Sequence, residues 1–255
     1  MKKTLSQPAL DVVKAYEALQ FGDQHVCTPY FNNKRQKVRG ALRVLVGKGT
    51  PSEIIEEAFL FSHREHIDLR QLSAEGLKTY LVDHNLGIDC SGLMYHVLDA
   101  EIRERTHKPL KSFLTFPNKS LFRKILATLR PAENTNVKTF ADEKNSNDIT
   151  LSEIQPGDII TFIGSKKVGN PDHILLIESV DDTILSYVHA YTFPSDGTYG
   201  HGVKRGNIEI TDAKMQIKDQ RWDDAEMCSV VRDAKEMNVK RLYSMSYVSK
   251  KNNTQ

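Results

Sequence analysis

Cys90 stands in a short polar run that could activate a cysteine nucleophile. The run Gly87-Ile88-Asp89-Cys90-Ser91-Gly92-Leu93 is followed by apolar residues at three- and four-residue spacing, Leu93, Met94, Val97, Leu98 and Ile102. This spacing predicts a helix with one buried face that begins at Cys90. A helix N-terminus carries unpaired N–H groups and the positive end of the helix dipole. We therefore expect it to lower the pKa of the Cys90 thiol and to hold an oxyanion.

The other two cysteines lack such a context. Neither Cys27 nor Cys228 is flanked by polar residues that start a helix, so both are interpreted as buried small hydrophobic residues. Three scattered cysteines form no disulfide framework and no zinc or redox motif, which favours a reducing compartment.

A thiol nucleophile needs a base and a residue that orients the base. His173 and His189 each interrupt an apolar strand, where an imidazole is costly unless it is paired. The two strands are adjacent and predict a hairpin around Asp181-Asp182. An odd-numbered loop would bring the two histidines face to face, whereas a two-residue loop would put them on opposite faces. The alternative is two independent core histidines, each with its own hydrogen bonds.

We expect neither a metal nor another cofactor. His63 and His66 are three residues apart on a predicted helix and could form half of a metal site. No carboxylate or cysteine pair completes it.

The order of elements predicts an α+β fold with an antiparallel sheet. Residues 1–84 are expected to form a mainly helical N-terminal extension or insertion, and residues 85–255 the core with its C-terminal strands. We expect a surface loop over Pro131–Asp148. The expected strands are Asp158–Ile163, His173–Val180, Ile184–Tyr191, Val203–Ile210 and Arg241–Val248.

Composition excludes several other functions. The net charge is +2, from 35 basic and 33 acidic residues, which gives no electrostatic case for nucleic acid. No apolar run is long enough to span a membrane, and no apolar segment follows Met1-Lys2-Lys3 as in a signal peptide. The chain as written is therefore expected to be cytoplasmic, unless a non-classical route exports it to the cell wall.

Four pieces, in order, resemble the NlpC-type family of papain-like peptidoglycan endopeptidases. They are Asp89-Cys90-Ser91-Gly92-Leu93, Gln155-Pro156-Gly157-Asp158 before a strand, His173 opening an apolar strand, and His189 followed by Ala190. They cover about residues 85 to 191. The resemblance implies a papain-like fold, with the nucleophile at the start of a helix that packs on the sheet.

The resemblance also implies roles for individual residues. Cys90 would be the nucleophile, His173 the general base and later acid, and His189 the residue that orients His173. Asp89 and Ser91 would line the substrate site. Pro29-Tyr30 is similar to the family's Pro-Tyr pair, whose tyrosine contacts substrate. This pair precedes Cys90 by 60 residues, which implies a helical insertion between residues 34 and 84.

The implied activity is cysteine peptidase cleavage of peptidoglycan stem peptides at the D-glutamyl–diaminopimelate bond, with peptidoglycan or muropeptides as the binding partner. Two alternatives stay open: an amidase or acyl transferase of the same fold, and a catalytically inactive binding module. No feature of the sequence sets an oligomeric state.

Overall fold

The computed structural model describes residues 2–32, 42–116, 121–165 and 172–246, which form an α+β fold. The α-helices are α1 (Gln7–Glu17), α2 (Pro51–Glu65), α3 (Ala74–Asp83), α4 (Cys90–Thr106), α5 (Leu121–Leu129), α6 (Pro131–Asn134), α7 (Val137–Ala141) and α8 (Ala225–Asp233). The strands are β1 (Lys3–Thr4), β2 (Leu19–Phe21), β3 (Gln24–Val26), β4 (Ser146–Asp148), β5 (Ile159–Ser165), β6 (His173–Asp181), β7 (Ile184–Tyr191), β8 (Gly202–Glu209), β9 (Arg221–Trp222) and β10 (Ala234–Leu242).

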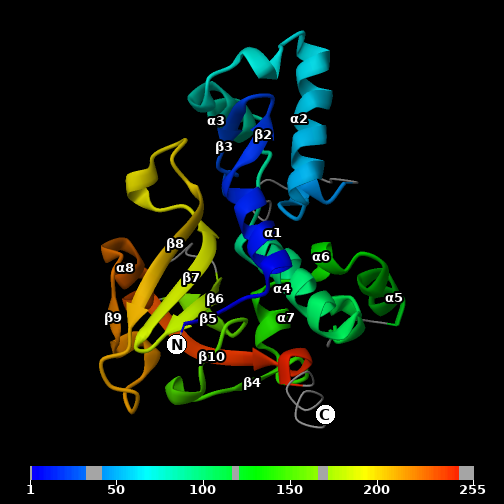
Figure 1. The fold of residues 1–255 in the computed structure, drawn as a ribbon. Helices are drawn as coiled ribbons and strands as arrows, with labels where there is room; N and C mark the ends of the chain where they lie inside the picture. Colours follow the sequence, from blue (N-terminus) through cyan, green and yellow to red (C-terminus); the bar gives the residue numbers. More distant parts are fainter. Residues whose placement is uncertain (1, 33–41, 117–120, 166–171, 247–255) are drawn as a thin grey trace.

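An antiparallel sheet divides the molecule into two hydrophobic layers. In the described part of the chain the strand order is β4-β10-β5-β6-β7-β8-β9, and β1 pairs with the far end of β6. Helices α1 and α4 pack on one face of the sheet, whereas α8 and β9 lie toward the other face (Figure 1). Because side chains alternate along a strand, each central strand contributes to both layers. On β6, Ile174 and Leu176 belong to the α4 layer, and Leu175 and Ile177 belong to the α8 layer.

Local capping interactions set the starts of several helices. Thr50 and Glu53 form a capping box at α2 with Pro51 in its first turn, and the Ser73 hydroxyl caps α3. Helix α4 begins at Cys90 and buries the predicted apolar face. Side chains from before and after residue 84 belong to one hydrophobic cluster, which joins the N-terminal helices to α4 and the sheet.

Two expected elements are wrong. Residues 131–148 are not a surface loop: Pro131 starts α6, Asn136 caps α7, and β4 follows. The last strand covers Ala234–Leu242 rather than Arg241–Val248, of which Tyr247 and Val248 lie outside the described residues. The first half of β10 contains charged and half-exposed residues, so it lacks the alternation of apolar and polar residues that would identify a strand in the sequence. It nevertheless pairs with β5 over most of its length.

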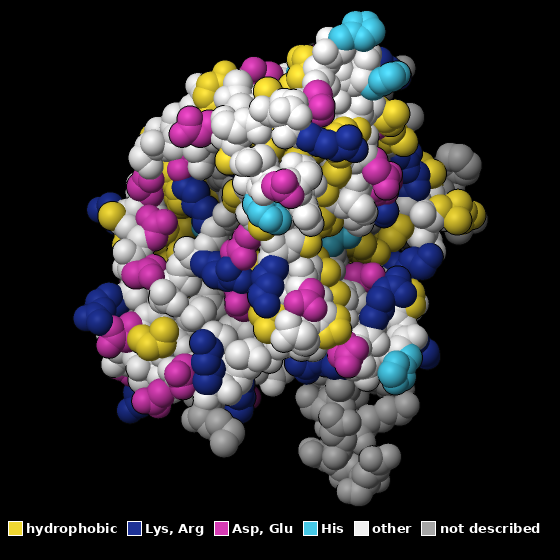
Figure 2. Space-filling model, turned by 45° about the horizontal axis from the view of Figure 1, so that its top comes forward, with side chains coloured by type: hydrophobic (Ala, Val, Ile, Leu, Met, Phe, Trp, Pro, Cys, Tyr) yellow, Lys and Arg dark blue, Asp and Glu magenta, His cyan; other side chains and the backbone are white. Residues whose placement is uncertain are grey.

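Figure 2 shows basic and acidic side chains interspersed over the face drawn. Among the described residues, no helix is both long and apolar enough to cross a membrane.

The turn Gln155-Pro156-Gly157-Asp158 is held by a buried carboxylate. Asp158 is fully buried; one of its oxygens accepts a hydrogen bond from the Gln155 N–H at 2.7 Å. Arg241 on β10 donates to both Asp158 oxygens, at 2.7 and 2.8 Å. This bidentate pair ties the turn before β5 to the neighbouring strand. Asp158 therefore has a structural role: it holds the turn 155–158 against β10.

We predict that Asp158→Ala lowers the free energy of unfolding by about 3 kcal/mol, because it leaves the Arg241 guanidinium without its buried partner. Asp11→Ala is the matched control, since the Asp11–Lys14 pair is exposed and 3.9 Å long. It should cost no more than about 0.5 kcal/mol. Urea unfolding followed by circular dichroism measures both; equal losses would contradict the structural role of Asp158.

Candidate active site

Cys90 lies at the first position of α4 and lines an open, polar cavity of about 380 Å³. Asp89 is the N-cap, and its side chain accepts from the Gly92 N–H at 2.6 Å. The Cys90 side chain is 4% exposed. The segment 133–138 and Asp172, the residue before His173, also line the cavity. The region expected to be a loop therefore forms part of the site.

Two segments of the N-terminal region flank the residues that lead into Cys90. Tyr30 forms a parallel bridge with Ile88, and Lys48 forms an antiparallel bridge with the same residue. Gly92 allows this close approach. A Cβ atom there would lie 2.7 Å from the Gly47 carbonyl oxygen and 2.8 Å from an Ile88 methyl group. Glycine in the motif is thus required by packing.

Lys48 is a site residue that sequence reasoning missed. Its side chain is almost fully buried, and the ammonium group donates to Asp89 Oδ1 at 2.7 Å, Ser91 Oγ at 2.5 Å and the Thr135 carbonyl at 3.0 Å. Ser91 Oγ also donates to Asp89 Oδ1 at 3.0 Å. The polar groups of Asp89 and Ser91 are therefore engaged with Lys48 at the wall of the cavity. A lysine between two glycines gives no sequence signal of this role.

His173 and His189 form a buried pair. Nε2 of His173 lies 3.0 Å from Nδ1 of His189, and both side chains are at most 1% exposed. Within the described residues, the outer nitrogens of the pair, Nδ1 of His173 and Nε2 of His189, have no hydrogen-bond partner. The ring of Tyr191 packs on His173 with centroids 4.5 Å apart. The pair meets, as the hairpin predicts.

The register that joins the histidines differs from the expected one. The turn has two residues, Asp182 and Thr183, because Asp181 pairs with Ile184. A regular hairpin of this kind would put the histidines on opposite faces. A β-bulge at Glu178 adds one residue to β6, between the Ile177–Tyr187 and Ser179–Ser186 pairs. The bulge restores a common face, and the histidines become diagonal neighbours.

Cys90 and His173 come together at one end of β6 but from opposite faces of the sheet. Helix α4 packs on the face of Ile174, whereas His173 pairs with Phe162 in the α8 layer. The link between them is the peptide that joins His173 to Ile174, since the Ile174 N–H is hydrogen-bonded to the Cys90 sulfur. His173 Nδ1 makes no hydrogen bond to Cys90 or to any other described residue.

Burial keeps all three groups neutral in this state. It raises the pKa of Cys90 to about 12, and the neighbouring Asp89 carboxylate adds to the rise. Lys48 and the N–H groups of Ile174 and Ser91 act in the opposite direction. The expectation of a lowered thiol pKa is therefore wrong, because desolvation outweighs the helix N-terminus. Burial also lowers the pKa of His189 to about 3, and burial together with His189 lowers that of His173 well below its usual value.

Tyr30 lies beside the sulfur. Its hydroxyl accepts from Asn32 Nδ2 at 3.2 Å, and burial followed by the proximity of Cys90 raises its pKa. Its ring is 6.0 Å from that of Tyr191, which in turn packs on His173. Tyr30 therefore connects the nucleophile to the histidine pair through aromatic contacts. The 60-residue separation in sequence is bridged by the pairing with Ile88.

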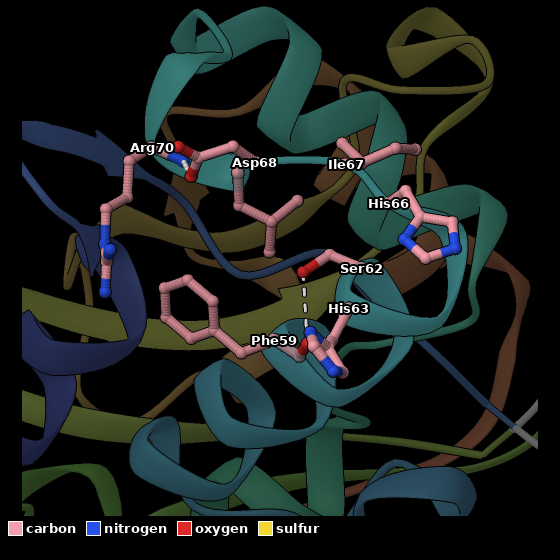
Figure 3. A pocket seen from close by; sticks show the side chains of 8 residues that line it. Phe59, Ser62, His63, His66, Ile67, Asp68 and Arg70 are labelled. Atoms are coloured by element: carbon pink, nitrogen blue, oxygen red, sulfur yellow. Dashed lines mark hydrogen bonds between the residues drawn. The ribbon is translucent and has the colours of Figure 1, made fainter.

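His63 and His66 lie away from this site. They line a shallow depression of about 650 Å³ at the end of α2, together with Phe59 and Asp68 (Figure 3). His66 is the left-handed C-cap of α2 with φ of 58°. No group of three or more potential ligands gathers among the residues that the structure describes.

Comparisons of the chain with protein-family models, with curated proteins and with solved structures gave no match.

We predict that Gly92→Ala lowers the free energy of unfolding by about 1–3 kcal/mol, because the new methyl group meets backbone and buried side chains. Gly76→Ala in α3 is the control. Its Cβ would find contacts of 3.4 Å or longer, and alanine is the better helix former. Thermal unfolding should show a lower melting temperature for Gly92→Ala and a higher one for Gly76→Ala. The packing argument would be refuted if Gly76→Ala lowered the melting temperature and Gly92→Ala did not.

We further predict that Cys90 in the substrate-free protein reacts slowly with iodoacetamide at pH 6. Its thiol pKa is about 12, so the rate should rise about tenfold per pH unit from pH 6 to 9, without a plateau. Peptide mass spectrometry separates Cys90 from the half-buried Cys27 and Cys228, which serve as internal controls. A rate plateau for Cys90 below pH 8 would show a preformed thiolate instead.

Proposed function

We propose that the chain is a cysteine hydrolase of papain-like organisation, which cleaves a peptide or amide bond with Cys90, His173 and His189. The hydrogen-bonded histidine pair carries this proposal. Its outer nitrogen, His173 Nδ1, is buried without a partner, in the residue next to the N–H that contacts the sulfur. A buried nitrogen without a partner is costly, and its place beside this contact makes it a candidate to accept the Cys90 proton.

The proposed chemistry starts from neutral groups. His173 donates its Nε2–H to Nδ1 of His189, which leaves Nδ1 of His173 free to accept the Cys90 proton. The thiolate attacks the carbonyl carbon, and N–H groups in the first turn of α4 stabilise the oxyanion. The His173 imidazolium then protonates the leaving amine as the C–N bond breaks. Water attacks the thioester with His173 again as base, the C–S bond breaks, and the Cys90 thiolate takes the proton from His173.

Substrate binding has a defined task in this mechanism. The thiol and the imidazole lie at one strand end without a direct hydrogen bond, and such bonds often tighten only in the substrate complex. Closing the cavity over Cys90 would bring the proton of the thiol to His173. The resemblance to NlpC-type enzymes supports peptidoglycan stem peptides, cut at the D-glutamyl–diaminopimelate bond, as the substrate.

One observation favours a second function, that of a binding module without turnover. The resting thiol is protonated and is not hydrogen-bonded to His173. A module that binds muropeptides in the cavity beside Cys90 would need neither a thiolate nor a hydrogen bond between Cys90 and His173. Turnover separates the two functions.

We predict that Cys90→Ala and His173→Ala each reduce hydrolysis of purified muropeptides at least 100-fold, since each removes a group that makes or breaks bonds. Cys228→Ala is the control. The Cys228 thiol packs in the α8 layer and donates to the Trp222 carbonyl at 3.8 Å, so this variant should stay within about twofold. Mass spectrometry of the released peptides gives the rate and the bond. Undiminished hydrolysis by Cys90→Ala would refute the mechanism; binding without hydrolysis by the unmodified protein would identify the module.

A further inference from the structure

The backbone around Lys48 is fixed by hydrogen bonds, in addition to the ion pair that the Lys48 side chain forms with Asp89. The carbonyls of three consecutive residues are each bound by a donor from elsewhere in the fold. The Asp89 N–H donates to Gly47 at 2.9 Å, Nε2 of His96 contacts the Lys48 carbonyl at 2.9 Å, and the Tyr16 hydroxyl donates to Gly49 at 2.8 Å.

The side chain of Lys48 then meets three acceptors, one for each proton of its ammonium group. They belong to the N-cap of α4, to the residue after Cys90 and to the wall of the cavity. A lysine 5% exposed loses most of its hydration, which these charge-assisted hydrogen bonds replace. Backbone and side chain together fix a positive charge beside the nucleophile.

We propose that Lys48 is a positioning residue of the Cys90 site: it fixes the first turn of α4 through Asp89 and Ser91, and it supplies the positive charge that favours the Cys90 thiolate. The proposal rests on the proposed function of Cys90 as a nucleophile. Without Lys48, the Asp89 carboxylate would stand beside the sulfur unneutralised and would oppose a second negative charge there.

Several groups around the sulfur bear on this charge balance. Those on the elements that surround the cavity and the strand end are Asp89, Tyr30, Lys48, Glu133, Lys138, Asp172 and His173. Lys138 is largely exposed and lies 3.8 Å from Asp172, so it is screened by solvent and partly balanced. Lys48, in contrast, is buried, and its ammonium group donates to both sequence neighbours of Cys90, Asp89 and Ser91.

The test compares Lys48→Met, which removes the charge, with Lys48→Arg, which keeps it. Lys240→Met is the matched control. Lys240 is also 5% exposed and also donates to a carboxylate, Asp148, at 2.7 Å, but it lies on β10 outside the cavity. Iodoacetamide alkylation of Cys90 is measured between pH 7 and 10 in each full-length variant, beside its melting temperature.

We expect Lys48→Met to slow the alkylation of Cys90 about tenfold or more at each pH, which equals a rise of about one pKa unit. Lys48→Arg should stay within about threefold, and Lys240→Met within about twofold although it melts earlier. If Lys48→Met does not fold, Lys48→Gln replaces it with the same expected slowing. Equal alkylation rates in the charge-removing variant and the Lys240→Met control would overturn the proposal and leave Lys48 a structural residue.

The readout does not depend on turnover. Slow alkylation of the charge-removing variant in a protein that hydrolyses no muropeptide would uphold the role of Lys48 at the thiol, while the proposed function would fail. Normal alkylation of that variant together with Cys90-dependent hydrolysis would refute Lys48 alone.

Discussion

The register between β6 and β7 is the constraint on which the candidate site depends. A two-residue turn and regular pairing would put His173 and His189 on opposite faces of the sheet, where their rings could not meet. The additional residue Glu178 restores a common face. Its carbonyl accepts from the Leu5 N–H and its carboxylate pairs with Arg205 on β8, so neighbouring elements hold the bulge. The histidine contact is thus fixed about five residues away from His173, by pairing geometry.

Burial is the second determinant, and it acts on all three proposed catalytic groups in the same direction. Desolvation disfavours the thiolate of Cys90 and the imidazolium forms of both histidines. Cys90 and His173 therefore form no thiolate–imidazolium pair in this state, and in the proposed reaction a proton must move before the sulfur can attack. Lys48 is the counterweight to this cost, because its ammonium group offsets Asp89 next to the sulfur.

The features of this arrangement that depend on nearby residues can be predicted from the sequence, whereas those that depend on distant residues cannot. The caps Thr50 and Ser73, the apolar face after Cys90 and the alternation in β6 and β7 act within a few residues, so they are visible in the sequence. The bulge at Glu178 has no such signal, since its partners are Leu5, directly after β1, and Arg205 on β8. Lys48 was missed for the same reason: its acceptors lie 41, 43 and 87 residues further along the chain.

The position of the sulfur limits how the proposed reaction can proceed. Cys90 belongs to the α4 layer, whereas His173 pairs with Phe162 of the α8 layer, and the peptide that joins His173 to Ile174 lies between them at the start of β6. At this strand end Asp172 lines the cavity, and the ring of Tyr30 lies 6.0 Å from that of Tyr191, which packs on His173. In the proposed reaction, a substrate in the cavity would lie beside Cys90 and beside Asp172, the residue before His173. Such binding would act at the start of β6, whereas the register that joins the two buried histidines is set further along β6, at the bulge.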